Sequence, residues 1–210
     1  MHPSDWRFFL NEHDYERMLN IRTNDMNNGV FQSTHYNRYE PTPYFALEEL
    51  LTQYEITTQD HVVDFGCGMG RLNFFLHHKT RASVVGIEMN DQFIREALKN
   101  EKSYRKKFKT YEQNIQFHCC FAEKYKIQPK ENKFYFFNPF SIPIFIKVLN
   151  NILLSVEESK RSVDVILYYP SDDYIFYLDH HTPFERIKEV TLPKLYDKNP
   201  QERFLIYRYV

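Results

Sequence analysis

A cluster of glycines constrains the fold of this 210-residue chain more than any other feature. The chain has only five glycines, and three of them, Gly66, Gly68 and Gly70, alternate within five positions. The apolar residues 62–65 just before them are typical of a short strand, and a helical pattern follows. A glycine turn between a strand and a helix lets a ligand approach the backbone and offers it the free N–H groups of the helix start. This segment therefore predicts a ligand-binding turn.

Short apolar segments alternate with helical patterns along the rest of the chain. Strands are expected at residues 62–65, 83–88, 115–120, 133–137, 162–169, 185–192 and 203–209, and helices at residues 71–78, 91–107, from Pro143 and at 172–178. Asp91 is expected to cap the helix of residues 91–107. The alternation predicts an α/β fold, in which a doubly wound, seven-stranded and mostly parallel sheet has helices on both faces. The last two strands have no helix between them and predict a C-terminal antiparallel hairpin.

The polar N-terminal region lacks the alternating strand and helix patterns of the rest of the chain. It has weak helical patterns around residues 6–10 and 15–19, followed by a loop that reaches Pro43, and a helix is expected at residues 44–54. We therefore divide the chain into an N-terminal helical extension with a lid loop, residues 1–43, and one ligand-binding domain, residues 44–210.

Charge and cysteine usage limit the classes of partner. The 27 basic and 28 acidic residues give a formal net charge of −1, so nucleic acid is not favoured as a partner, although the composition does not exclude it. The three cysteines suit neither a disulfide framework nor a zinc site, and the paired histidines lack companion ligands, so no metal is expected. Neither a signal peptide nor a membrane-spanning stretch is visible. We expect a cytoplasmic protein, either a monomer or a weak dimer, with no membrane partner.

Two acidic residues accompany the glycine turn. Asp64 stands two residues before the first glycine, and Glu88 ends the second expected strand. A carboxylate at the end of that strand can accept hydrogen bonds from ribose hydroxyls. The glycine spacing is G-x-G-x-G, whereas a dinucleotide turn has G-x-G-x-x-G. The pattern predicts a nucleoside site of another kind.

This combination resembles the cofactor motif of class I S-adenosylmethionine-dependent methyltransferases, which have a Rossmann-like fold, and the resemblance covers residues 40–210. It implies S-adenosylmethionine as cofactor. Phe121 stands where many relatives have an Asp beside the adenine amino group, so the Ala122 main chain or Glu123 would have to supply that contact. The residues implied to lie against the cofactor are Thr42, Asp64, Gly66, Cys67, Gly68, Gly70, Glu88, Met89, Phe121 and Ala122.

Asn138-Pro139-Phe140, after the fourth expected strand, resembles the [DN]-P-P-[FYW] motif of methyltransferases that act on amino groups, although the second proline is missing. The resemblance implies that Asn138 and the Pro139 carbonyl orient the target nitrogen and that Phe140 stacks on a planar substrate. The alternative is an Asn-Pro pair that merely ends a strand. Upstream, the Thr-Pro-aromatic segment resembles the loop that covers the methionine end of the cofactor in amino-methylating enzymes, and the resemblance implies a lid that contains Tyr39 and Tyr44; a proline-set helix start explains the segment equally well.

The resemblance implies a methyltransferase that transfers a methyl group from S-adenosylmethionine to an unidentified acceptor. A partial Asn-Pro motif favours an amino or amide nitrogen, whereas the balanced charge and the lack of an added recognition domain favour a small metabolite. The alternative is a non-catalytic module that binds the cofactor or a partner on the same fold.

Overall fold

A seven-stranded sheet with the strand order β3-β2-β1-β4-β5-β7-β6 forms the centre of the protein. The computed structural model describes residues 11–24, 39–109, 114–193 and 195–210. The strands are β1 (His61–Phe65), β2 (Ser83–Glu88), β3 (Ile115–Cys119), β4 (Lys133–Phe136), β5 (Val163–Tyr168), β6 (Glu185–Thr191) and β7 (Arg203–Tyr209). The helices are α1 (Glu12–Leu19), α2 (Tyr44–Gln53), α3 (Arg71–Thr80), α4 (Asp91–Phe108), α5 (Ile142–Glu158) and α6 (Asp172–His181), with the 3-10 helix η1 (Ala122–Lys124) after β3.

The first five strands are parallel, and β7 runs antiparallel to both of its neighbours, β5 and β6. The expected doubly wound sheet and its C-terminal hairpin are therefore confirmed. The strand order reverses between β1 and β4, since β2 and β3 lie on one side of β1 and the later strands lie beyond β4. In open α/β sheets, ligands bind at the carboxyl ends of the strands beside such a reversal.

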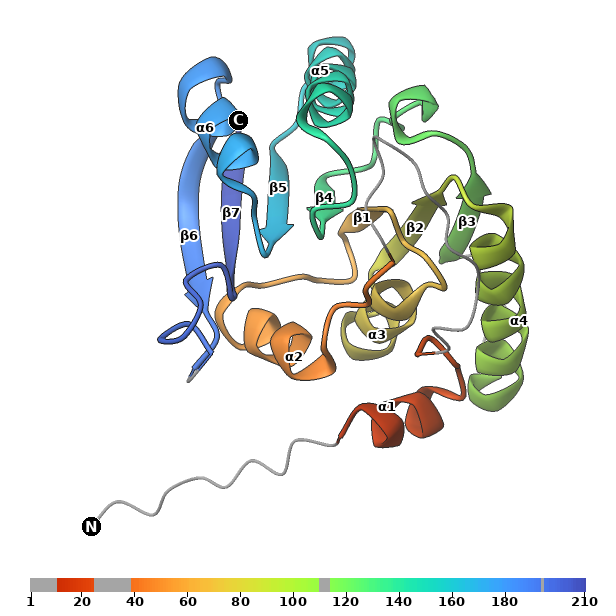
Figure 1. Ribbon diagram of the computed structural model, residues 1–210. Coiled ribbons are helices and arrows are strands. Elements are labelled where there is room, and N and C mark those ends of the chain that lie inside the picture. Colours follow the sequence, from red (N-terminus) through yellow and green to blue (C-terminus); the bar gives the residue numbers. More distant parts are fainter. Residues whose placement is uncertain (1–10, 25–38, 110–113, 194) are drawn as a thin grey trace.

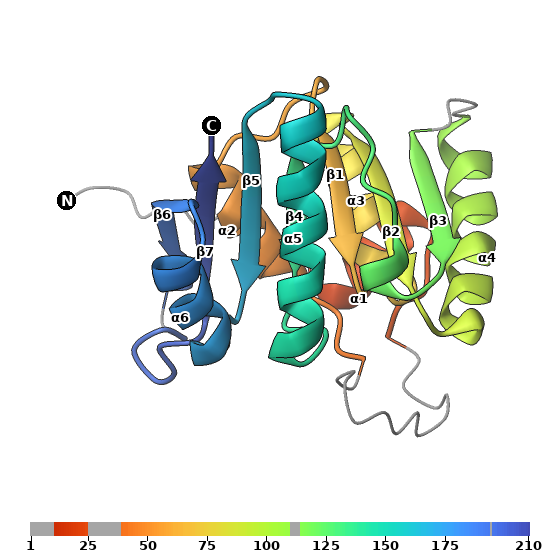
Figure 2. The same ribbon diagram turned by 90° about the horizontal axis from the view of Figure 1, so that it is seen from above.

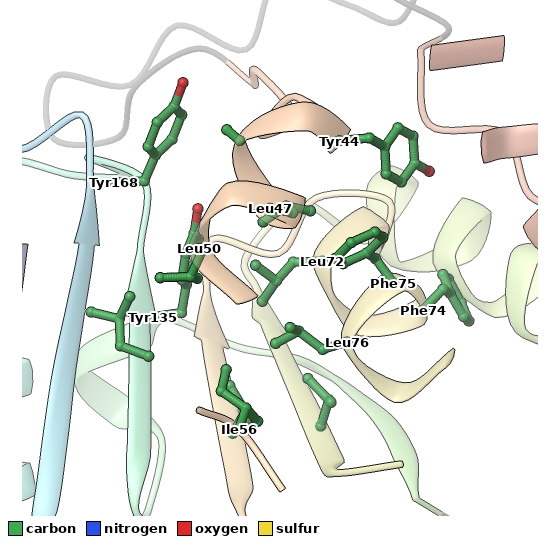
Figure 3. Close-up of a cluster of buried hydrophobic side chains, with 14 of the residues drawn as sticks. Tyr44, Leu47, Leu50, Ile56, Leu72, Phe74, Phe75, Leu76, Tyr135 and Tyr168 are labelled. Atoms are coloured by element: carbon green, nitrogen blue, oxygen red, sulfur yellow. The ribbon is translucent and has the colours of Figure 1, made fainter. Parts of the chain in front are cut away.

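Helices cover both faces of the sheet, which explains why β4 and β5 are buried along their whole length. Figure 2 shows α1, α2 and α3 behind the sheet and α5 and α6 in front of it. The cluster behind the sheet contains Leu47 and Leu50 of α2 and Phe75 of α3, as the close-up in Figure 3 shows. The cluster in front is built around Phe145 and Val148 of α5.

Helix α1 belongs to the same hydrophobic cluster as α2 and α3, because Tyr15 and Leu19 are buried in it. Its C-terminal end is also attached to α4: Asn20 Nδ2 donates to the carbonyl of Ser103 (2.9 Å), and Lys107 Nζ donates to the carbonyl of Arg17 (3.0 Å). Figure 1 shows α1 beneath α3, near the lower end of α4. The expected helical pattern at residues 6–10 lies outside the described residues.

The N-terminal cap of α4 differs from the expectation. Asn90, and not Asp91, is the capping residue, because its backbone is extended (φ −81°, ψ 112°) and its side-chain oxygen accepts from the N–H of Gln92 (2.9 Å). Asp91 is already helical and pairs instead with Arg95 on the exposed surface (2.6 Å).

Over the described ranges, no helix is both long and apolar enough to cross a membrane.

Candidate functional site

The glycine turn connects β1 to α3 with three residues of positive φ. Gly66, Gly68 and Gly70 have φ values of 82°, 52° and 88°, a region that other residues rarely adopt, and Gly70 is the N-cap of α3. The N–H groups of Gly66 and Cys67 both donate to the carbonyl of Ile87 in β2 (2.8 and 3.1 Å), which holds the turn against the end of that strand.

Side chains from two segments that are distant in sequence lie very close to the glycine turn in space. A Cβ atom on Gly66 would lie 2.6 Å from Cβ of Pro139, and a Cβ atom on Gly68 would lie 1.9 Å from Cε2 of Tyr39. Glycine is therefore required here by close approach as well as by φ. The structure brings the predicted acceptor motif and the predicted lid residue Tyr39 against the predicted cofactor turn.

Glu88 ends β2 beside the same turn. Its Oε2 accepts from the N–H of Gly68 (3.1 Å), and its Oε1 accepts from the N–H of Asn90 (2.8 Å). Burial raises the pKa of Glu88 above its ordinary value, although these backbone hydrogen bonds oppose the shift. Each carboxylate oxygen keeps a further lone pair, so a fixed carboxylate of this kind suits the ribose hydroxyls of a nucleoside.

Asp64 is buried at the end of β1, with 4% of its surface exposed. With the amide of Asn73 oriented to satisfy both of its neighbours, Nδ2 donates to Asp64 Oδ2 (3.0 Å) and Oδ1 accepts from the N–H of Gly86 (3.1 Å). Burial, and then the nearby charge of Glu88, raise the pKa of Asp64 to about 8. The negative charge that Asp64 and Glu88 carry when ionised favours a cation over an anion beside them.

Cys67 and Thr42 point into the protein. The Cys67 thiol packs on Gly86, where an added Cβ would lie 2.6 Å from Sγ, and burial raises its pKa well above the usual range. The Thr42 hydroxyl is buried and shares a hydrogen bond with Tyr135 Oη of β4 (2.8 Å). Both side chains help to position the walls of the site.

The predicted adenine-side residues lie at the ends of two paired strands. Glu88 of β2 pairs with Cys119 of β3, and Met89 follows the first of these strands directly. After β3, Phe121 is about half exposed (49%), whereas Ala122 is buried at the start of η1. Met89, Phe121 and Ala122 therefore all follow the carboxyl ends of β2 and β3, where Glu88 lies.

On the acceptor side, Asn138 follows β4 with a positive φ of 41° and leads to Pro139 beside Gly66. Phe140 is only 1% exposed, and its ring meets Phe136 edge-on with the centroids 6.0 Å apart. The ring of Phe140 therefore lies in the core in front of the sheet and does not present a face to a substrate, contrary to the expectation from the motif.

The two predicted lid tyrosines have different surroundings. Tyr39 lies on Gly68, 4.8 Å from the ring of Phe93 between centroids. Tyr44 is fully buried at the start of α2 and stacks on Tyr15 (4.6 Å), so it is a core residue and not part of a surface lid. The pattern of aromatic residues could not distinguish these two environments.

Arg71 and Tyr169 were not predicted. Arg71 is the first residue of α3 and is buried among polar groups of the N-terminal region. Tyr169 follows β5 with a positive φ of 48°. β4 pairs with β5 at Phe136 and Leu167, and Asn138 and Tyr169 follow two residues later, just beyond the ends of the two strands. A cation at the expected start of a helix is a sequence signal for Arg71, because the helix dipole there favours an anion; Tyr169 has no such signal.

Known proteins resemble this chain in sequence and in fold. The family profile described as "Methyltransferase domain" matches residues 44–167. A protein-lysine N-methyltransferase from Saccharolobus islandicus (strain REY15A) is 38% identical over 63 residues, which make up 30% of this chain and 39% of the relative. The match thus spans well under half the length of that curated relative.

Solved structures share the fold at low sequence identity. An RNA methyltransferase from Salinibacter ruber, in complex with S-adenosyl-L-homocysteine, superposes with a TM-score of 0.54 at 19% identity and covers 81% of this chain and 92% of its own. An rRNA methylase from Streptococcus thermophilus has a TM-score of 0.51 at 13% identity and covers 79% of this chain and 91% of its own. With the family profile spanning more than half of its residues, the chain belongs to the methyltransferase-domain family.

Proposed function

We propose that this protein binds S-adenosylmethionine beside the glycine turn and Glu88 and transfers its methyl group to a nitrogen atom of an acceptor at Asn138. The observation that supports the proposal is the contact of Pro139 with Gly66, because it brings the segment after β4 against the glycine turn. Methyl transfer is a displacement in line, so a donor and an acceptor site must adjoin in this way.

The residues around the glycine turn fit this cofactor. Glu88 offers a fixed carboxylate for ribose hydroxyls, and the buried Asp64 lies near enough for the charge of Glu88 to raise its pKa. S-adenosylmethionine supplies an activated methyl group on a positively charged sulfur. A bound cation would favour the ionised forms of Asp64 and Glu88, which burial disfavours, whereas the pyrophosphate of a dinucleotide would disfavour them further.

We assign the positioning of the acceptor nitrogen to Asn138. Its side-chain oxygen would accept a hydrogen bond from an N–H of the acceptor and so direct the nitrogen lone pair towards the methyl carbon. A nitrogen acceptor agrees with the relative from Saccharolobus islandicus, which is a protein-lysine N-methyltransferase. The burial of Phe140 removes the ring that would stack on a planar base, so we favour an amino nitrogen that does not require stacking.

Binding of S-adenosylmethionine and S-adenosylhomocysteine tests the cofactor. At a hundredfold excess over the dissociation constant, a specific ligand stabilises the folded state by about 2.7 kcal/mol, or roughly 5 to 10 °C in melting temperature. We expect this shift with both sulfur ligands, a smaller shift in Glu88→Ala, and none with NADH as the control. No shift with any ligand would contradict the proposal and leave a non-catalytic partner-binding module as the better explanation.

Transfer of an isotope-labelled methyl group tests the acceptor. Lysine-containing protein, RNA and small amines are offered separately with labelled S-adenosylmethionine. We expect label in the amino substrates and a loss of about a hundredfold or more in Asn138→Ala at unchanged cofactor affinity. Equal transfer by wild type and Asn138→Ala would show that Asn138 merely ends β4.

A further inference from the structure

Arg71 has an unusual position for a cation. It is the first residue of α3, directly after the glycine turn, where the helix dipole favours negative charge, and α3 has no acidic residue in its first turn. Only 4% of its side chain is exposed. A buried guanidinium at such a position has to be compensated by groups from elsewhere in the fold.

Among the described residues, the hydrogen-bond partners of Arg71 come from the N-terminal region. Arg71 Nε donates to Thr23 Oγ1 (2.8 Å), Nη1 donates to Glu12 and to the carbonyl of Thr42 (3.3 Å), and Nη2 reaches Glu16 Oε1 (3.4 Å). These partners lie in residues 11–24 and 39–43, which we call the N-terminal clamp. The face of the guanidinium also lies over the ring of Tyr44, 4.4 Å from its centroid.

The N-terminal clamp is held to the glycine turn at a second point. Asn100 of α4 binds both backbone groups of Arg22, with its Oδ1 accepting from the N–H and its Nδ2 donating to the carbonyl (2.9 Å each). The same Nδ2 donates to the carbonyl of Met69 in the turn (3.1 Å). Arg71 and Asn100 therefore attach the clamp to the turn and to the start of α3 at two points.

Between these two points the N-terminal clamp covers the turn itself. Tyr39 Oη donates to the carbonyl of Thr23 (2.9 Å), and the Tyr39 ring lies on Gly68. Gly68 in turn donates its N–H to Glu88. The side chain that covers Gly68, next to Glu88, thus comes from a segment that the matched methyltransferase domain, residues 44–167, does not contain.

We propose that Arg71 is a positioning residue which fixes the N-terminal clamp on the glycine turn, so that the clamp forms one wall of the nucleoside site. This inference rests on the proposed function, because it assigns the clamp a role in binding the cofactor. Arg71 does not touch the cofactor; it acts through Thr23 and Tyr39.

The experiment compares ligand affinity with stability in four variants of the full chain. Arg71→Met removes all of the hydrogen bonds of Arg71, and Arg71→Lys keeps the charge without the planar fork of donors. Thr23→Val is a milder change that removes a single hydroxyl partner. The matched control is Arg161→Met, because Arg161 is also held by several hydrogen bonds, to the carbonyls of Glu131, Ser155 and Ser159, but lies far from the turn in sequence.

Isothermal titration with S-adenosylhomocysteine and urea unfolding are measured for each variant. We expect Arg71→Met to weaken binding by about tenfold or more. Thr23→Val should bind less tightly than wild type, and the affinity of Arg71→Lys should lie between those of wild type and Arg71→Met. Arg161→Met should lose stability at unchanged affinity. If all four variants change affinity only in proportion to their stability, the role of Arg71 is merely structural and the inference is wrong. Tighter binding in Arg71→Met would also overturn it, because the clamp would then compete with the ligand.

Hydrogen exchange of the ligand-free protein separates this inference from the proposed function. We expect faster exchange at residues 66–70 in Arg71→Met and Thr23→Val than in Arg161→Met. If wild type fails to bind S-adenosylhomocysteine but this pattern of exchange is seen, the proposed cofactor is wrong and the attachment of the clamp to the turn stands. Unchanged exchange at the turn would overturn the inference whatever the ligand.

Discussion

Asp64 shows how strongly one buried side chain depends on its surroundings. It has almost no contact with solvent, and the charge of Glu88 lies nearby. Both effects disfavour its ionised form, which is why its pKa rises to about 8. The ligand-free site therefore holds a proton near neutral pH that the unfolded chain would release.

This difference makes folding stability depend on pH with a definite sign. An unfolded Asp has a pKa of about 3.9, so between that value and about 8 the folded protein binds more protons than the unfolded chain. Stability must then fall as the pH rises through this window. We expect Asp64→Asn, which cannot ionise, to melt higher than wild type at pH 8 to 9 and to converge with it towards pH 4. Parallel melting curves across this range would contradict the assignment.

Some residues of the site could be predicted from the sequence and others could not. Asp64, Glu88 and the glycines were predictable because their spacing relative to the strands is a local property of the sequence. The contacts of Tyr39 and Pro139 with the turn were not, because they join segments that are far apart in the chain. Phe140 was misjudged for the same reason: its burial depends on Phe136 and on α5, and not on its neighbours in the motif.

At the scale of elements, α4 illustrates how a helix start is determined by backbone conformation. Asn90 and Asp91 are both good capping residues by type, and the sequence alone favoured the second. The carboxylate of Glu88 decides between them, because it accepts the N–H of Asn90 and holds that residue in an extended conformation before the helix. The helices were predictable from their apolar periodicity, and the expected first residues of α2, α3, α4 and α6 match the observed ones. The capping residue of α4 was not predictable, because it depends on this tertiary contact.

The cap can be tested by comparing two adjacent substitutions. We expect Asn90→Ala to lower the free energy of unfolding by about 1 kcal/mol, since the N–H of Gln92 loses its acceptor. Asp91→Ala removes only an exposed pair with Arg95 and should lower it by about 0.3 to 0.5 kcal/mol. Urea unfolding measures both. A larger loss for Asp91→Ala would show that Asp91 is the cap after all.

At the scale of the whole molecule, the two ends of the parallel strands carry different side chains. The candidate site lies at their carboxyl ends, and a buried ion network around Asp164 of β5 lies at their amino ends. Asp164 accepts from Lys133 of β4 (3.1 Å) and from Arg208 of β7 (2.7 and 2.9 Å), and Tyr54 donates to it as well. Burial alone would raise the pKa of Asp164. Hydrogen bonds from Arg208 and Tyr54 and the charge of Lys133 lower it by more, so the pKa lies below its usual value.

This network joins three strands, and we expect Asp164→Asn to be costly. The substitution leaves Lys133 and Arg208 without their shared carboxylate and should lower the free energy of unfolding by about 3 to 5 kcal/mol. Glu189→Gln breaks a more exposed pair with Arg203 and should cost less than about 1 kcal/mol. Urea unfolding measures the difference, and similar losses in both variants would contradict this account. Affinity for S-adenosylhomocysteine should be unchanged in either variant.

The position of β7 between β5 and β6 also dictates an order of assembly. Strand β6 precedes β7 along the chain, yet among the described strands β7 is its pairing partner. During synthesis from the N-terminus, β6 therefore emerges before there is a strand for it to join. Its charged residues Glu185, Arg186, Lys188 and Glu189 are of the kind that disfavours pairing of an exposed strand with other chains. Because β7 links β6 to β5, β6 cannot join the sheet until β7 has been made.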